Sequence, residues 1–140
     1  MIVVDTTVWI DFFNGAGTPE DHHLNTLISE ERAIALIDVI FFEILQGIRN
    51  DTAYERTRTL LMHYPILRMD GLSFFEQAAM IYRTCRQRGF TIRSTVDCLI
   101  ASVCLTHDVA LFQKDADFGR IAGVTSLKIH HPDPLPRSIT

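Results

Sequence analysis

Several features of common protein classes are missing from this chain of 140 residues. Its three cysteines, Cys85, Cys98 and Cys104, are an odd number without CxxC spacing, which is typical of buried free thiols and not of a disulfide framework or a zinc site. No apolar run reaches the roughly 18 residues that a membrane-spanning helix needs. The patterns GxxxxGK[ST], GxGxxG and GxSxG are also absent, so neither a phosphate-binding loop nor a serine nucleophile elbow is predicted.

The composition is that of an ordinary folded protein. Hydrophobic residues make up 47% of the chain and charged residues 21%. The length predicts one domain with its own core. The apolar start, Met1-Ile2-Val3-Val4, has no basic segment before it, so we expect a first strand and not a signal peptide, and a cytoplasmic location.

Positive charge is scarce and is carried almost entirely by arginine. The net charge is −4, and only Lys114 and Lys128 are lysines. A negative chain is unusual for a protein that binds nucleic acid, because phosphate binding relies on a basic surface. Arginine is nevertheless the better two-pronged phosphate donor, and several arginines directly precede Asp97. Two interpretations stay open for this run, a phosphate-binding patch or a solvated helix face: Arg83, Arg86, Arg88 and Arg93.

Short apolar runs alternate with longer helical patterns along the chain. Strands are expected at 1–4, 33–37, 66–69, 109–113 and 127–129. Helices are expected from about 8 to 13, at 19–29, 38–47, 51–63, 73–89 and 95–107, with a short one after 117. This alternation predicts an α/β fold with a mostly parallel sheet.

The expected helix starts depend on short polar side chains. Such residues accept hydrogen bonds from the free N–H groups of the first helical turn. A capping box is predicted at Ser73-Phe74-Phe75-Glu76. The single N-caps expected elsewhere are Thr6 or Thr7, Thr18, Asp38 and Thr95.

Acidic side chains occur where the apolar pattern would normally exclude charge. Asp5 ends the first strand, Glu43 interrupts the run VIFFEIL, Asp97 opens an apolar helix, and Asp115 and Asp117 follow the fourth strand. A carboxylate beside apolar surface is costly unless a cation or a hydrogen bond compensates it. Ligands of parallel sheets bind beyond the carboxyl ends of the strands. With Glu43 and Asp97 expected in the first turns of their helices, the sequence predicts one acidic pocket that holds a divalent metal.

Ligands that are all oxygen favour a hard cation, Mg²⁺ or Mn²⁺. In phosphodiester hydrolysis such an ion lowers the pKa of a bound water and neutralises charge on the phosphoryl oxygens. A further carboxylate can orient the water as general base. Because crowded carboxylates repel one another, metal binding is expected to stabilise the fold.

Each acid also has a structural explanation. Asp5 could cap the following helix, and Asp97 could interact with the dipole of its own helix. Asp115 or Asp117 could cap the short helix that follows them. Glu43 is the hardest to explain in this way, because neither capping nor solvation accounts for an acid inside so apolar a run.

The six histidines include two adjacent pairs, His22/His23 and His130/His131. Both pairs are expected at the surface. Neither has the i,i+4 spacing that places two imidazoles on one helix face, so no metal site is predicted for them.

Four segments resemble the PIN domain, and specifically the VapC-type ribonuclease toxins of prokaryotic toxin–antitoxin pairs. They are IVVDTTVWID at 2–11, EILQG at 43–47, DCLIA at 97–101 and LFQKDADF at 111–118. The order and spacing match over roughly residues 1–130. The resemblance implies a three-layer fold with the sheet order 3-2-1-4-5, a nuclease domain at 1–131 and an extended C-terminal tail at 132–140 with Pro132, Pro134 and Pro136.

The resemblance also implies an activity and its partners. These are a Mg²⁺- or Mn²⁺-dependent endonuclease acting on single-stranded RNA, and a homodimer held inactive by a cognate antitoxin. Asp5 and Asp97 would be the direct metal ligands. Glu43 and Asp115 would complete the acidic quartet, partly through water.

Two further positions receive expectations from the same resemblance. Thr7, where family members often have Ser, would lie near the metal or the scissile phosphate. Asp117 would either support the quartet or cap its helix. Gln113 stands where many members carry Thr, Ser or His, and this departure removes no acid.

Two other classes of protein fit part of the pattern. A phospho-receiver module also gathers acids and Mg²⁺ at strand ends, but it has paired acids after its first strand, where this chain has only Asp5. A PIN-like protein that binds RNA without cleaving it is disfavoured only by the intact acids. Phosphorylation by a small-molecule phosphodonor, or RNA binding without turnover, would identify either class.

Overall fold

The computed structural model describes residues 1–135, which form five strands and seven helices in alternation. The one predicted proline of the tail that lies outside the described residues is Pro136. The elements are β1 (Ile2–Val4), α1 (Thr6–Asn14), α2 (Pro19–Ser29), β2 (Ile34–Ile37), α3 (Asp38–Gln46), α4 (Asp51–Leu61), β3 (Ile66–Leu67), α5 (Leu72–Gln87), α6 (Thr95–His107), β4 (Ala110–Phe112), α7 (Ala116–Val124) and β5 (Ile129–His130).

The five strands form one sheet in the order β3-β2-β1-β4-β5, and every pair is parallel. β1 lies at the centre and pairs through Val3 with Ala35 on one side and with Leu111 on the other. Strands buried on both faces read as continuous apolar runs and not as alternating ones. The α/β class, the parallel sheet and the order 3-2-1-4-5 are therefore confirmed.

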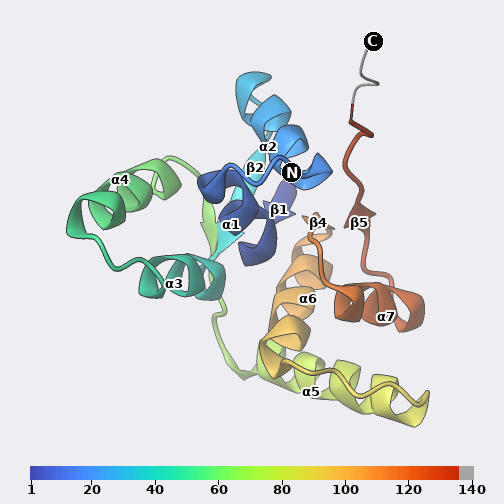
Figure 1. The fold of residues 1–140 in the computed structure, drawn as a ribbon. Helices are drawn as coiled ribbons and strands as arrows, with labels where there is room; N and C mark the ends of the chain where they lie inside the picture. The colour runs from blue at the N-terminus through green and yellow to red at the C-terminus, as the bar shows by residue number, and fades with distance from the viewer. Residues whose placement is uncertain (136–140) are drawn as a thin grey trace.

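Helices cover the sheet in two groups (Figure 1). Crossovers between parallel strands are right-handed, so connections that run outward from β1 in opposite directions place their helices on opposite faces. α1 to α4 connect β1, β2 and β3, whereas α5, α6 and α7 connect β3, β4 and β5. α5, α6 and α7 pack on one another, and α1 packs on α2 and α3. The reversal of strand order occurs between β1 and β4, where a ligand site is expected.

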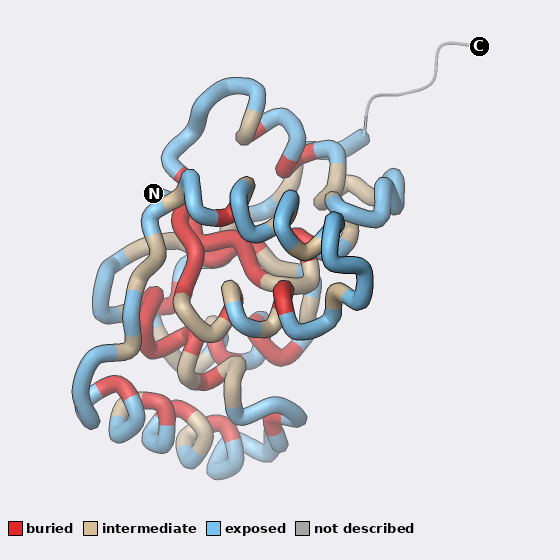
Figure 2. Tube along the Cα trace, turned by 90° about the vertical axis from the view of Figure 1, so that its left-hand side faces the viewer, coloured by how far each residue is buried: buried red, intermediate tan, exposed pale blue. Residues whose placement is uncertain are grey.

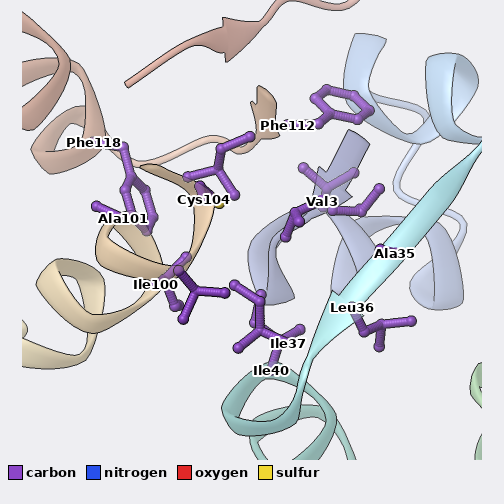
Figure 3. Close-up of a cluster of buried hydrophobic side chains, with 14 of the residues drawn as sticks. Val3, Ala35, Leu36, Ile37, Ile40, Ile100, Ala101, Cys104, Phe112 and Phe118 are labelled. Carbon is purple, nitrogen blue, oxygen red and sulfur yellow. The ribbon is translucent and has the colours of Figure 1, made fainter. Parts of the chain in front are cut away.

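The core surrounds the sheet, and one part of it lies between the sheet and α6. Figure 3 shows Ile100 and Cys104 of α6 on the side that faces Ile37 and Val3 of the strands, and Ala101 beside Phe118 of α7. These residues are almost completely buried, and Figure 2 shows buried segments in the interior with exposed ones around them. All three cysteines are buried and free, as predicted. No helix among residues 1–135 has the length and apolarity to cross a membrane.

Several predicted caps are wrong. Thr6 and Thr7 are already helical, and Asp5 is the N-cap because its extended backbone lets its carboxylate accept from Thr7 N–H. Ser73 forms no capping box, because α5 already starts at Leu72. The N-cap is Gly71, which has a φ of 88° and no side chain to accept a hydrogen bond.

Two other helix starts differ by one residue from the prediction. Thr95 is the first residue of α6 and follows Ser94 as N-cap, without a side-chain cap. Asp38 is the first residue of α3 and binds Val39 N–H at 2.9 Å and Met69 N–H at 3.2 Å, so it joins α3 to the segment after β3. The predicted cap Thr18 is confirmed.

The strands are shorter than the apolar runs that predict them. Residues 109–113 contribute only Ala110–Phe112, and the last strand is Ile129–His130, whereas 127–129 was predicted. Pairing along the sheet sets these limits, because β1 itself offers three residues to its neighbours. An apolar run indicates burial, but only the register decides which residues form the ladder.

One histidine prediction is wrong. His23 is buried and not at the surface. Its Nε2 lies 2.9 Å from Nε2 of His130, so one histidine of each pair contacts one of the other pair. Asp133 N–H donates to His23 Nδ1 at 3.3 Å. The segment 132–135 has no helix or strand, and it is held against α2 at this point.

Candidate active site

The acidic side chains gather where β1 and β4 end. Asp5 follows β1 directly and caps α1, while Asp115 follows β4 and caps α7 through Asp117 N–H at 2.9 Å. β1 and β4 are neighbours, with Val4 opposite Phe112. Because parallel strands end at the same edge, both capping acids face the same region. Asp97 lies in the first turn of α6 and approaches the same edge.

Asp97 has a strongly perturbed environment. Its Oδ2 is buried and has no hydrogen-bond partner among the described residues. Burial, followed by the negative charges of neighbouring acids, raises the pKa of Asp97 to about 7. The contributing charges belong to Asp5, Asp115, Asp117 and Glu43. A buried carboxylate oxygen without a donor and surrounded by like charge is suited to a cation.

Three of the carboxylates are close enough to share one ion. Asp97, Asp115 and Asp117 each offer an oxygen, and these oxygens lie within 4.8 Å of one another. Asp5 is outside this group, although its charge acts on Asp97 and that of Asp115 acts on Asp5. Asp5 is therefore not a member of this group, although of the neighbouring acids its charge has the largest effect on the pKa of Asp97.

Asp5 is held by a hydroxyl of its own helix. Its Oδ2 accepts from Thr7 Oγ1 at 2.7 Å and from Thr7 N–H at 3.3 Å. Burial raises the pKa of Asp5, and the two hydrogen bonds from Thr7 oppose this effect. Lys114 N–H donates to the same hydroxyl at 3.3 Å, so Thr7 joins the ends of β1 and β4. Capping and a place in the acidic cluster are compatible roles for Asp5.

Glu43 approaches the same edge from α3. It lies in the second turn of that helix, and the expectation of a first-turn position is wrong because α3 begins at Asp38. Its Oε1 accepts from Thr6 Oγ1 at 3.2 Å. Burial, and then the charge of Asp5, raises the pKa of Glu43. Thr6 was not among the predicted site residues, since nothing local indicates a contact with a residue 37 positions away.

Asp117 is the acid at this edge that accepts hydrogen bonds from two arginines. It is 1% exposed and accepts from Arg93 N–H at 3.0 Å and from an Arg120 guanidinium N–H at 2.7 Å. Burial raises the pKa of Asp117, but these hydrogen bonds and the two charges outweigh it and hold the pKa below its usual range. The N-cap of α7 is Asp115, so of the two roles predicted for Asp117 the structure does not support helix capping.

A cleft of about 410 Å³ opens beside the acids. It is lined by Thr7 and Asp115 together with Arg93, Lys114 and Asp11. Lys114 Nζ lies 2.6 Å from Asp11 Oδ2. Arg93 is 76% exposed along its side chain and is 3.8 Å from Asp115. Lys114 and Asp11 were not predicted as site residues, because their pairing spans 103 positions.

The residues present fit a hard divalent cation. The candidate ligands are all carboxylate oxygens, and no His or Cys joins them in the described group. The unpartnered Oδ2 of Asp97 supplies the independent sign of a missing positive charge. The cluster can thus hold an ion next to a cleft that also carries cationic side chains.

The raised pKa of Asp97 makes the stability of the metal-free protein depend on pH. Asp97 keeps its proton up to about pH 7 when folded but loses it near 3.8 when unfolded. Between these values the folded state binds more protons, so the free energy of unfolding falls as the pH rises. Asp5 and Glu43 act in the same direction, whereas His130, with a lowered pKa, destabilises the fold as the pH falls below 6.5.

Comparing the wild type with Asp97→Asn isolates this contribution. In EDTA, thermal unfolding should show the wild type losing on the order of 1–2 kcal/mol relative to the variant between about pH 4 and about pH 8, after discounting for solvent screening. Mg²⁺ should restore the wild type at the higher pH and leave the variant almost unchanged. Parallel pH profiles for the two proteins would show that Asp97 does not titrate as described.

Comparisons with known proteins give the family of the chain. The family model of the PIN domain matches residues 2–124. Ribonuclease VapC11 of Mycobacterium tuberculosis and a VapC ribonuclease of Mycobacterium bovis are each 38% identical to this chain over 129 residues, covering 91% of it and 96% of their own length.

Solved structures show the same fold at lower identity. VapBC2 from Rickettsia felis, bound to a DNA fragment from its promoter, has a TM-score of 0.73 and 18% identity, covering 95% of this chain and all of that one. A toxin–antitoxin complex from Klebsiella pneumoniae has a TM-score of 0.68 and 21% identity over 92% of this chain and all of that one. Because the family model spans most of the described residues and the VapC relatives cover nearly the whole sequence, this chain belongs to the PIN domain family.

Proposed function

We propose that this protein is a metal-dependent endoribonuclease that hydrolyses phosphodiester bonds in RNA and acts as the toxin of a toxin–antitoxin pair in the cytoplasm. The observation that carries the proposal is the unpartnered Oδ2 of Asp97 inside a cluster of acids beside an open cleft. The relatives with 38% identity are named ribonucleases, which gives the reaction class. Residues 1–131 would form the nuclease domain and 132–140 a tail.

Asp97 and Asp5 are the proposed metal ligands, with Asp115 beside them. Mg²⁺ or Mn²⁺ bound there would supply a water of lowered pKa and neutralise charge on the phosphoryl oxygens. Glu43, whose pKa is raised, is suited to accept a proton from the attacking water. Thr7 holds Asp5 in place through its hydroxyl. Asp117 has an indirect role: it accepts from the N–H of Arg93 and so orients the segment that carries that side chain.

The cleft offers cationic side chains for the RNA backbone. Lys114 is paired with Asp11 at 2.6 Å, so much of its charge is already compensated. Arg93 lies 3.8 Å from Asp115 and 3.7 Å from Asp117, longer than a hydrogen bond, and its guanidinium is exposed. Arg93 is therefore the side chain in this cleft best able to turn towards a phosphate.

Replacing Arg93 separates the two interpretations of the arginine run. Arg93→Ala should weaken binding of single-stranded RNA and lower the slope of log Kd against log salt by about 0.7 for one lost phosphate contact. Fluorescence anisotropy over a range of salt concentrations measures both quantities. Arg83→Ala, an exposed position on α5, is the matched control and should leave the slope unchanged. If both variants kept the wild-type slope, neither arginine would contact a phosphate and the run would be a solvated face.

A protein partner is the second part of the proposal. Several similar structures are toxin–antitoxin complexes. In this chain a groove of about 650 Å³ lies between α1, α3 and α4, and Glu43 is among its lining residues. Its walls include Ile10, Phe13 and Leu60, of which Ile10 and Phe13 are exposed. An amphipathic antitoxin segment fits such a groove, and we include a homodimer in the proposal by analogy with the family.

The test is cleavage of total cellular RNA by the purified chain, free of antitoxin, in Mg²⁺, in Mn²⁺ and in EDTA. Discrete products should require metal and should disappear with Asp5→Ala, because that variant removes a proposed ligand. Products that persist in EDTA or with Asp5→Ala would contradict the metal mechanism. RNA binding without turnover by a folded, metal-loaded protein would indicate a binding module.

A further inference from the structure

A second hollow, of about 580 Å³, adjoins the cleft on the far side of α7. Ala116, the first residue of α7, lines both spaces. The other wall of the hollow is the segment that follows α5, represented by Arg88 and Phe90. Figure 1 shows this segment turning back from the end of α5 towards α6, and α5 and α7 are in contact. A chain lying in the cleft could therefore continue into the hollow.

An exposed aromatic ring forms part of the hollow. Phe90 is 41% exposed, although large aromatic side chains are normally buried. The guanidinium carbon of Arg120 lies 5.8 Å from the centroid of the Phe90 ring. Arg120 is itself fixed by its 2.7 Å hydrogen bond to the buried Asp117. The ring and the guanidinium are thus held beside each other as a preorganised platform.

Two of the residues of α7 that line the hollow have no side chain. Gly119 and Gly123 line it four positions apart, so they lie on one face of α7. A Cβ atom added at either glycine would meet no other atom within 4 Å. Glycine inside a helix costs stability relative to alanine, and packing does not require it here. What the two glycines provide is open space next to Phe90.

The rim of the hollow is positive in a chain whose net charge is −4. Arg88 and Arg120 both line it. Arg88 is exposed and forms no ion pair with any of residues 1–135. Arginine beside an exposed aromatic ring is the combination with which proteins hold single-stranded nucleic acid, since the ring stacks on a base and the cation binds a phosphate.

We propose that the hollow formed by Phe90, Arg88, Arg120 and the glycine face of α7 binds one nucleobase of a single-stranded RNA whose scissile phosphate lies in the adjoining cleft. The base stacks on Phe90 over Gly119, and Arg88 binds the flanking phosphate. This site rests on the proposed nuclease function and deepens it, because it would select RNA that is unpaired next to the cleavage position. A hydrophobic peptide segment fits it less well, since two guanidinium groups line the space.

The test uses the full-length Asp97→Asn protein in Mg²⁺, which should bind RNA without cleaving it. Short single-stranded RNAs carry 2-aminopurine at one position, moved along the chain in successive oligonucleotides. Stacking on Phe90 should quench the fluorescence at one position only. Phe90→Ala should remove this quenching and raise Kd roughly 5- to 100-fold, the range found for loss of one base–aromatic stack.

Three further variants separate stacking from a change of structure. Phe90→Tyr keeps an aromatic ring and should retain the quenching. Gly119→Leu fills the hollow without a backbone clash and should weaken binding as Phe90→Ala does. Phe75→Ala, which removes another exposed aromatic ring at the start of α5, should have no effect.

Each outcome decides the proposal. No quenching at any position, or quenching that persists in Phe90→Ala and Gly119→Leu, would overturn the base site. Unchanged RNA binding with weakened antitoxin binding would assign the hollow to a protein and would also overturn it. Cleavage by the wild-type protein is measured separately: cleavage without Phe90-dependent stacking rejects the base site alone, and stacking without cleavage rejects the nuclease alone.

Discussion

Replacing Asp97 with Asn should lower the rate of RNA cleavage by about 10²- to 10³-fold or more, with the fold intact. The loss is expected because the variant removes the charge of the most central carboxylate, and metal-assisted stabilisation of phosphoryl charge is worth several kcal/mol. Asn keeps the size of the side chain and one oxygen. Since the Oδ2 of Asp97 has no hydrogen-bond partner in the described residues, its replacement breaks no contact within the protein.

The metal-free variant should also be more stable than the wild type near neutral pH. Removing one charge relieves the repulsion that raises the pKa of Asp97 to about 7 after the effect of burial. Loss of activity together with a gain in stability is a signature that a purely structural residue would not produce. Kinetics in Mg²⁺ and thermal unfolding in EDTA measure the two effects on the same preparations.

Asp108→Asn is the matched control for this experiment. Asp108 lies at the opposite end of α6, is exposed, and has a φ of 51°, which Asn also tolerates. It should retain cleavage at the wild-type rate. If both variants cleave equally well, Asp97 is not a metal ligand. If Asp97→Asn unfolds, its role is structural and the assigned site is wrong.

Asp117→Ala should destabilise the protein by about 1 to 3 kcal/mol, the range for removing hydrogen bonds to a charged group, because both arginines of the pair are partly exposed. The reason is that Asp117 is 1% exposed and accepts both Arg93 N–H and the Arg120 guanidinium. Its replacement leaves the N–H of Arg93 without its acceptor and Arg120 without its closest partner. Urea or thermal unfolding above pH 5 measures the loss, since the low pKa of Asp117 makes the pair complete well above 3.8.

Two further variants serve as controls for the Asp117→Ala prediction. Asp117→Asn retains an acceptor for Arg93 N–H and should cost less than Asp117→Ala. Asp51→Ala replaces an exposed acid in the first turn of α4 and should cost only a fraction of a kcal/mol, roughly that of a helix-dipole interaction. A small effect of Asp117→Ala, similar to that of Asp51→Ala, would show that the buried pair does not hold α7 and the segment before α6 together.

The sheet and its order were predictable because they follow from patterns that act locally. Apolar runs of a few residues, separated by helical periodicity, specify parallel strands with crossovers, and the match of four motifs to one family supplies the order. The acids were predictable for a related reason, since charge is costly inside apolar segments and Asp5 and Asp115 follow strands directly. Helix starts were less predictable, because three adjacent residues could each cap α1 and the structure uses Asp5, not Thr6 or Thr7.

The contacts that distinguish the acids from one another were not predictable. Asp117 and Asp115 are two positions apart in the chain, yet one is buried between two arginines and the other caps α7. The partner of Asp117 on the main chain, Arg93, is 24 positions away. Hydrogen bonds across such distances depend on how α6 and α7 pack, and no local pattern records that packing.

What the sequence by itself determined is the class of fold, the family and the set of acids at one edge of the sheet, because hydrophobic periodicity and strand ends act within a few residues. Only the tertiary structure decided how those acids divide their roles: Asp97 with an unpartnered oxygen, Asp5 held by Thr7, Asp117 neutralised by arginine. It also decided that Phe90 lies beside Arg120 over two glycines of α7. The physical reason is that burial and electrostatics at each group are set by neighbours distant in the chain.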